Sequence, residues 1–422
     1  MSSILTNNGA MVALQTLKSI NMDLTKTQAM ISTGKEIGSA KDNSAVWAIS
    51  KVMESDVAGF KAISSSLSLG ESTVAVARQA TETVTDLLTQ MKGKIVASQE
   101  SNVDRVKIQS DITALKDQIT SVVGAAQFNG LNLLSNKSAT IGSGTVNVLS
   151  SLDRSSTGVT ASNIAVGKED LGLTAASFTG AAIIAGTAST LNATQTQTIA
   201  ITAPTAIGTV YSIGLAGTDA DASKFTPANY TTGATTTDQN KILYVSREGD
   251  TAADVAKGLA SAFAGYMSKQ GLDTDIVNTR ASGANLVFTS SKTDATDTIA
   301  ARVDFGTPAT AATIGGGLAS LSNFDVTTTY GAKAALGAIE GAIQLAVDAA
   351  ASFGSSQGRI ETQAAFINKL SDGLKSGIGT LVDANMEEAS ARLQALQVQQ
   401  QLGVQSLSIA NQAPQSILSL FR

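Results

Sequence analysis

The sequence predicts a mainly α-helical protein. We expect its N- and C-terminal segments to form a long antiparallel helical bundle and coiled coil, with a β-rich (α+β) insertion between them. Two observations support this fold class. Apolar residues recur at steps of three and four through both flanks of the chain, which is the spacing of one face of a helix. Three of the four prolines and all five tyrosines lie between residues 204 and 330, and proline breaks helices.

These patterns divide the chain into five segments. We expect residues 1–40 to form the N-terminal half of a terminal coiled coil, 41–138 the N-terminal part of a helical rod, 139–327 a β-rich, surface-exposed insertion, 328–381 the C-terminal part of the rod, and 382–422 the C-terminal half of the coiled coil. Each helical part is therefore built from both ends of the chain.

The terminal segments carry apolar rows that predict a coiled coil. Its pairing rows are expected at Ala10, Ala13, Leu17, Ile20, Leu24, Thr27 and Ile31, and at Ala391, Ala395, Val398, Leu402 and Ile409. The last segment has a second row at Leu393, Leu396, Val404 and Leu407, and a lone pair of helices cannot bury both rows. We therefore expect copies of the same chain to cover these surfaces, and the termini to be disordered before assembly. The predicted coiled-coil and subunit-interface residues are Leu17, Ile20, Leu24, Ile31, Leu393, Leu396, Val398, Leu402, Val404, Leu407, Ile409, Leu420 and Phe421.

The rod is predicted from a longer row that begins at Val46 and reaches Ile95, interrupted only by Asp56, Gly70 and Thr81. At 1.5 Å per residue it corresponds to a helix of roughly 75 Å. A shorter helix is expected from Ile108 to about residue 125. The predicted rod core consists of Ile49, Met53, Phe60, Ile63, Leu67, Val74, Val84, Leu88, Ile95, Ile343, Phe353, Ile360, Ile367, Leu374 and Ile378.

The middle of the chain differs in composition from its flanks. Short β-branched runs predict strands at residues 145–149, 197–202, 210–215, 241–246 and 285–290. One helix is expected between residues 251 and 269, with Thr251 as its N-cap and Asp254 completing a capping box.

Composition excludes several classes of function. The chain has no cysteine and no histidine, which rules out disulfides, thiolate nucleophiles and imidazole-based catalysis. A net charge of −5 with scattered basic residues argues against nucleic acid as a partner. The most apolar run, residues 334–353, contains Glu340 and Asp348, so no membrane insertion is expected. We expect no catalytic residue, metal site or cofactor, and we expect that the protein is not an enzyme.

Clusters of carboxylates in the middle of the chain leave an alternative open. Glu248 lies near Asp250 and Asp254, and two further pairs follow, Asp273 with Asp275 and Asp294 with Asp297. Such clusters can serve acid–base chemistry or bind a hard cation, but spacing alone is weak support. The prediction is that these carboxylates are solvated charges in loops.

Three stretches match a known family. They are ISTGKEIGSAKDNSA from Ile31 to Ala45, AAQFNG from Ala125 to Gly130, and the ending SARLQALQVQQQLGVQSLSIANQAPQSILSLFR from Ser390 to Arg422. On these motifs the sequence resembles bacterial flagellin, particularly its alphaproteobacterial type. The resemblance covers roughly residues 1–138 and 328–422 and leaves the middle uncovered.

This resemblance implies a structural subunit that polymerises into the helical flagellar filament used for swimming. The implied partners are further copies of the chain or related flagellins, the flagellar export chaperone and type III export apparatus, the filament cap and hook-associated proteins. The implied location is the extracellular filament, reached without a cleavable signal peptide, and the first ten residues, MSSILTNNGA, contain no signal pattern. Two alternatives remain: a hook–filament junction protein, or a filament subunit whose middle carries adhesive or enzymatic activity.

Overall fold

The computed structural model describes residues 7–155, 158–179, 183–192, 195–221, 224–233, 235–294, 296–307 and 312–420, without the side chains of residues 154–155 and 413–420. The chain forms two compact units. We call residues 1–65 with 365–422 the terminal unit, and residues 66–364 the central unit. Long helices precede and follow a β-rich middle along the chain, so the predicted fold class is confirmed.

Within the described residues the α-helices are α1 Asn8–Thr33, α2 Ser44–Ala97, α3 Arg105–Ala125, α4 Thr236–Gln239, α5 Ala252–Gln270, α6 Thr329–Val382 and α7 Met386–Leu420. Short 3-10 turns are η1 Pro227–Tyr230 and η2 Ala319–Asn323. The strands are β1 Gln127–Phe128, β2 Leu131–Asn132, β3 Thr145–Ser155, β4 Gly158–Gly167, β5 Ser177–Phe178, β6 Ser189–Leu191, β7 Thr196–Ala200, β8 Val210–Thr218, β9 Leu243–Val245, β10 Asn278–Ser282, β11 Asn285–Thr289, β12 Thr298–Gly306 and β13 Ala312–Thr313.

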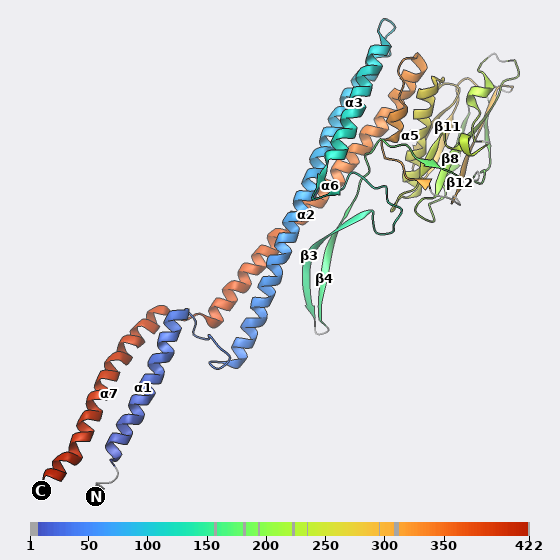
Figure 1. Cartoon of the computed structure of the whole chain (residues 1–422). Helices are drawn as coiled ribbons and strands as arrows, with labels where there is room; N and C mark the ends of the chain where they lie inside the picture. Colours follow the sequence, from blue (N-terminus) through green and yellow to red (C-terminus); the bar gives the residue numbers. More distant parts are fainter. Residues whose placement is uncertain are drawn as a thin grey trace. The chain divides into compact units, whose positions relative to one another are not determined.

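In the terminal unit, α1 and α7 lie side by side and antiparallel (Figure 1). The α1 helix begins where the Asn7 side chain accepts a hydrogen bond from the Ala10 amide, and it ends at Gly34 with φ of 67°, a conformation that favours glycine. Gly34 also accepts a hydrogen bond of 2.9 Å from the Ala384 amide, and the Glu36 amide donates to the Val382 carbonyl at 2.8 Å. The break between α1 and α2 is thus paired with the break between α6 and α7.

The apolar row of α2 is buried through the central unit. Leu67, Val74, Val84, Leu88 and Ile95 are all buried, and so are Ile63, Phe353, Ile360 and Ile367 of the predicted rod core. Thr81 interrupts this row without leaving a polar group unpaired, because its hydroxyl donates to the Ala77 carbonyl at 2.8 Å.

Gly70 interrupts the same row for a steric reason. A Cβ at this position would lie 2.5 Å from Cγ1 of Val148, which belongs to the β3–β4 hairpin. The hairpin also accepts a hydrogen bond of 2.9 Å at the Ser150 carbonyl from the Gln363 side chain on α6. Glycine at position 70 therefore allows the hairpin to contact the helix backbone closely.

In the β-rich part of the central unit, strands β8, β11 and β12 share a hydrophobic core with α5, which lies beside them (Figure 1). One sheet has the strand order β6-β12-β8-β9 and another has the order β10-β11-β7. Phe263 of α5 meets Phe288 of β11 edge-on at 6.2 Å between ring centroids. All five predicted strand segments contain strands, and the Thr251–Asp254 capping box is present, whereas several described strands, among them β4, β10 and β12, were not predicted.

One residue of the predicted rod core is exposed, so its prediction is wrong. Ile49 is 54% exposed, whereas its neighbour Ser50 is buried and donates a hydrogen bond to the Trp47 carbonyl at 2.9 Å. The buried face thus passes through Ser50 rather than Ile49 at the start of α2. The other predicted core residues are only half-buried: Met53, Phe60, Ile343, Leu374 and Ile378.

Among the described helices, α6 contains an 18-residue window whose mean hydropathy of 1.3 would allow a membrane span by length and composition. The core helix of a folded domain passes the same test. Because Ala346 and Phe353 of α6 are buried inside the central unit, its apolar character has an explanation within the chain.

We predict that Gly70→Ala lowers the free energy of unfolding by about 1–3 kcal/mol, because the new methyl group overlaps Val148. Thermal unfolding followed by circular dichroism measures the change. Gly93→Ala is the matched control on α2, where an added Cβ meets nothing within 4 Å, and it should be neutral or stabilise by up to about 1 kcal/mol. Adding Val148→Ala to Gly70→Ala should restore part of the loss; equal melting temperatures for both glycine variants would contradict the packing argument.

Candidate assembly surface

A seam of buried and half-buried side chains joins α1 to α7. On α1 it contains the predicted residues Leu17, Ile20, Leu24 and Ile31. On α7 it contains Leu393, Leu396 and Leu407. An added Cβ on Gly403 would lie 3.2 Å from Cδ1 of Leu17, so glycine lets the two helices approach closely at that level.

Polar contacts fix the register of this seam. The Asn7 side chain donates to the Ala410 carbonyl at 2.9 Å, and the Gln400 side chain donates to Oδ1 of Asn21 at 2.8 Å. Both contacts join uncharged groups, and the one between Asn7 and Ala410 is partly buried. They place the start of α1 beside the distal part of α7.

A second set of apolar side chains on the same two helices faces solvent. We call it the exposed apolar row, and its members are 55% to 64% exposed: Met11, Val12, Leu14 and Met22 on α1, with Val398, Leu402, Val404 and Ile409 on α7. No Lys, Arg, Asp or Glu occurs between residues 393 and 421. Large uncharged apolar surfaces of this kind mark sites of protein–protein contact.

The structure corrects the pairing predicted for α7. The sequence assigns Val398, Leu402 and Ile409 to the seam with α1, but these residues are exposed, and Leu393, Leu396 and Leu407 of the second row form the seam instead. Val404, which the sequence places in that second row, is exposed as well. The periodicity reveals two rows and cannot say which one meets α1. Of the remaining predicted interface residues, Leu420 has only its backbone within the described residues, and Phe421 lies outside them.

The cluster that suggested acid–base chemistry has structural partners. Glu248 accepts hydrogen bonds from the Gly142 and Gly144 amides at 2.5 and 2.6 Å, and these bonds lower the pKa of its carboxyl. Asp250 accepts a hydrogen bond of 2.6 Å from the Tyr244 hydroxyl, while burial raises the pKa of its carboxyl. Asp254 completes the capping box of α5.

The other predicted clusters are only partly solvated. Asp275 forms an ion pair of 2.7 Å with Lys333, and Asp273 is buried and pairs with Lys292. Asp297 is also buried, so the prediction of solvated loop charge is wrong for Asp273 and Asp297.

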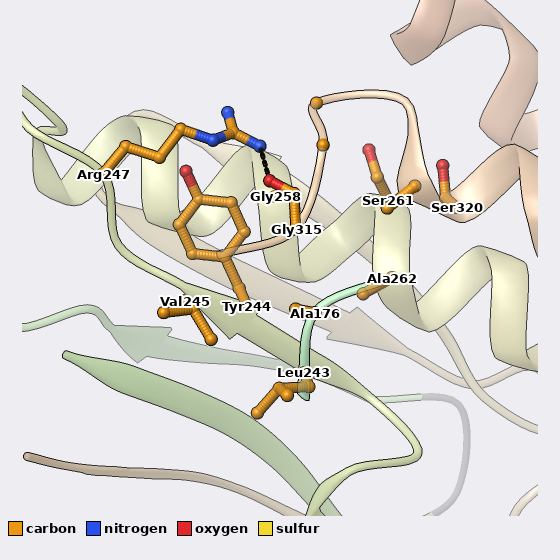
Figure 2. Close-up of a pocket in the computed structure, with 13 residues that line it drawn as sticks. Ala176, Leu243, Tyr244, Val245, Arg247, Gly258, Ser261, Ala262, Gly315 and Ser320 are labelled. Carbon is orange, nitrogen blue, oxygen red and sulfur yellow. Dashed lines mark hydrogen bonds between the residues drawn. The ribbon is translucent and has the colours of Figure 1, made fainter. Parts of the chain in front are cut away.

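A small cavity lies between α5 and the segment from Gly315 to Ser320 (Figure 2). Arg247 crosses one side of it and donates to the Gly315 carbonyl at 2.8 Å, with the Tyr244 ring below. Its volume of about 40 Å³ compares with roughly 300–1,000 Å³ for small-molecule sites. This cavity has room for little more than a water molecule.

Comparisons with known proteins agree with the sequence motifs. The family model of the bacterial flagellin N-terminal helical region matches residues 4–139, and that of the C-terminal helical region matches residues 336–421. Flagellin A of Rhizobium meliloti is 36% identical over 435 residues, covering 100% of both chains. Flagellin FljM of Caulobacter vibrioides is 30% identical over 426 residues, covering 100% of this chain and 99% of the relative.

Solved structures resemble the chain more distantly. The flagellar hook associated protein-3 from Legionella pneumophila has a TM-score of 0.36 at 11% identity, covering 78% of this chain and 98% of that chain. A likeness at this level carries no argument about function.

We predict a pH dependence for the contact that Glu248 makes with residues 142–144. Because the folded state lowers the pKa of this carboxyl below its ordinary value of 4.5, the contact stabilises the protein above pH 4.5 and is lost as the pH falls through the lowered value. Glu248→Gln should therefore melt below the wild type near neutral pH, and the difference should vanish in acid. A melting difference that stays constant from neutral pH into acid would contradict this reading.

Proposed function

The chain belongs to the bacterial flagellin family and is a structural subunit of the flagellar filament, and we propose that its exposed apolar row forms contacts between successive subunits. The observation that carries this proposal is the solvent exposure of eight large apolar side chains on a pair of helices that has no charge over most of α7. The full-length relatives are flagellins, so they favour a filament subunit over a hook–filament junction protein.

Burial energetics support contact with other subunits. Fully burying a large aliphatic side chain stabilises by about 1.5–3 kcal/mol relative to leaving it exposed. The α1–α7 seam already occupies Leu17, Ile20 and Leu396, so it cannot also cover Leu402 or Ile409. In a helical polymer each subunit presents different patches to its neighbours, and such contacts do not close on themselves. A second row on the same helices suits that arrangement.

We further propose that α1 and α7 become firmly ordered only on assembly. An isolated pair of helices with one seam lacks the third element that usually makes packing stable, and helical stability in proteins comes mostly from tertiary packing. Few buried apolar contacts also make a region prone to local unfolding. The half-burial of Leu17, Ile20 and Leu24 fits this expectation.

The remaining expectations from the sequence are kept as proposals. The division of the chain at residues 40 and 381 is supported by the breaks between α1 and α2 and between α6 and α7, and the division at 138 and 327 by strands that begin after α3 and by the start of α6 at Thr329. Export as an unfolded chain, through a type III apparatus with a chaperone, is supported by a sequence without cysteine, which cannot form disulfides. Folding beneath a filament cap outside the cell, with no enzymatic activity, completes the proposal.

We predict that Leu402→Asn raises the critical concentration for polymerisation by about 5- to 30-fold, as the loss of roughly 1–2 kcal/mol of apolar contact implies. Sedimentation of filaments formed from purified subunits measures it. The control is Ile141→Asn in the central unit, where the side chain is 87% exposed and outside the terminal helices. If both variants polymerise like the wild type, the exposed apolar row is not the contact surface.

We also predict that amide hydrogen exchange separates subunit from filament. In the dissociated chain, amides of α1 and α7 should exchange within seconds, whereas in filaments they should be protected by at least about 100-fold, because assembly closes the second row. The α5 helix is the internal control, since Phe263 and Met267 bury it in the central unit in either state. Strong protection of α1 and α7 in the dissociated chain would overturn ordering on assembly.

A further inference from the structure

Two aspartates face each other at the end of the central ladder of the β6-β12-β8-β9 sheet. The last pair of the β8–β12 register joins Thr218 to Thr298. Asp219 follows the first of these residues and Asp297 precedes the second, so the next positions across the ladder are both acidic. Like charges that lie opposite each other on neighbouring strands destabilise a sheet.

A third carboxylate belongs to the same group. One carboxylate oxygen from each of Asp219, Asp221 and Asp297 lies within 4.8 Å of the other two. Calcium binds oxygen ligands at 2.3–2.6 Å, so two ligands on opposite sides of the ion are about 5 Å apart. The three oxygens are close enough to share one coordination sphere.

Asp297 adds an observation independent of the clustering. This residue is only 2% exposed, and its Oδ1 atom is buried with no hydrogen-bond partner in the described part of the chain. Burial raises the pKa of its carboxyl, and the negative charges of Asp219, Asp294 and Asp221 raise it further, against a smaller opposing effect of Lys224. A buried oxygen without a partner is costly, and a cation would offset that cost.

Backbone contacts hold the acidic residues in place. Oδ2 of Asp219 accepts hydrogen bonds from the Lys224 and Phe225 amides at 3.0 and 2.8 Å. Oδ1 of Asp294 accepts from the Thr296 and Asp297 amides, both at 2.9 Å, and so fixes the turn that carries Asp297. The Asp219 carboxylate and the backbone of Asp297 are therefore held in place before any ion binds, whereas Asp221 is exposed.

We propose that Asp219, Asp221 and Asp297 bind one calcium ion, which neutralises the carboxylates at the end of the paired strands β8 and β12. Carboxylate oxygens are the ligands that calcium prefers, and its coordination geometry is flexible. Magnesium demands a near-ideal octahedron and usually keeps several of its waters, whereas calcium accepts an irregular set of carboxylate oxygens. Calcium is thus the ion that suits this group of three aspartates. The carboxylates of Glu248, Asp250 and Asp254 hold backbone or side-chain donors instead, and carry no such proposal.

Isothermal titration of the full-length, dissociated chain with calcium chloride tests the proposal. We expect one calcium ion per chain with a dissociation constant of roughly 0.1–1 mM, as in other extracellular calcium modules, and weaker binding of magnesium. Asp297→Asn should weaken calcium binding at least about tenfold. Asp153→Asn, which changes an exposed carboxylate on β3, should leave it unchanged.

Thermal unfolding distinguishes loss of the site from failure to fold. The wild type should melt at a higher temperature in about 5 mM calcium than in chelator, because an ion bound only by the folded chain stabilises it. Asp297→Asn should melt in chelator at or above the wild-type temperature, since it removes charge repulsion, and calcium should raise its melting temperature much less than that of the wild type. The absence of binding to the wild type at millimolar calcium, or equal binding and equal stabilisation in Asp297→Asn, would overturn the proposal.

Discussion

The structure depends on the burial of helical apolar rows by segments from opposite ends of the chain. Each long helix of one flank has a partner in the other flank, and in the central unit these rows are largely buried, as Leu88 and Phe353 illustrate. In the terminal unit the same constraint is met only in part, because α7 carries two rows and α1 covers one. On our proposal, the row that α1 leaves uncovered is what distinguishes a filament subunit from a self-contained helical bundle.

The sequence predicts the helical flanks well because their signal is long and repeats at one period. Over about seven heptads, single exceptions such as Gly70 and Thr81 do not hide the pattern. It fails where the repeat offers two solutions. At the start of α2, the buried residue that follows Val46 is Ser50, four positions on, and not Ile49, three positions on. On α7, the buried row passes through Leu396 and not through Leu402. Periodicity defines faces, and only the partner decides which face is buried.

The candidate cation site shows a different limit. The pair Asp294 and Asp297 stands out in the sequence, yet Asp294 holds a turn, while the companions of Asp297 in space lie far earlier in the chain. Asp219 and Asp297 meet only because β8 and β12 pair in one register, and β12 was not predicted. Without that strand, no sequence pattern brings these carboxylates together.

The hydrogen bonds between the two helix breaks have a consequence for how the termini behave. The carbonyls of Gly34 and Val382 tie the two connecting segments to each other. Displacing one segment past the other breaks both bonds, and the left-handed Gly34 lies at their junction. These bonds link α1 to α7 where the two helices meet the connecting segments. A neighbouring subunit that binds one of these helices therefore also positions the other.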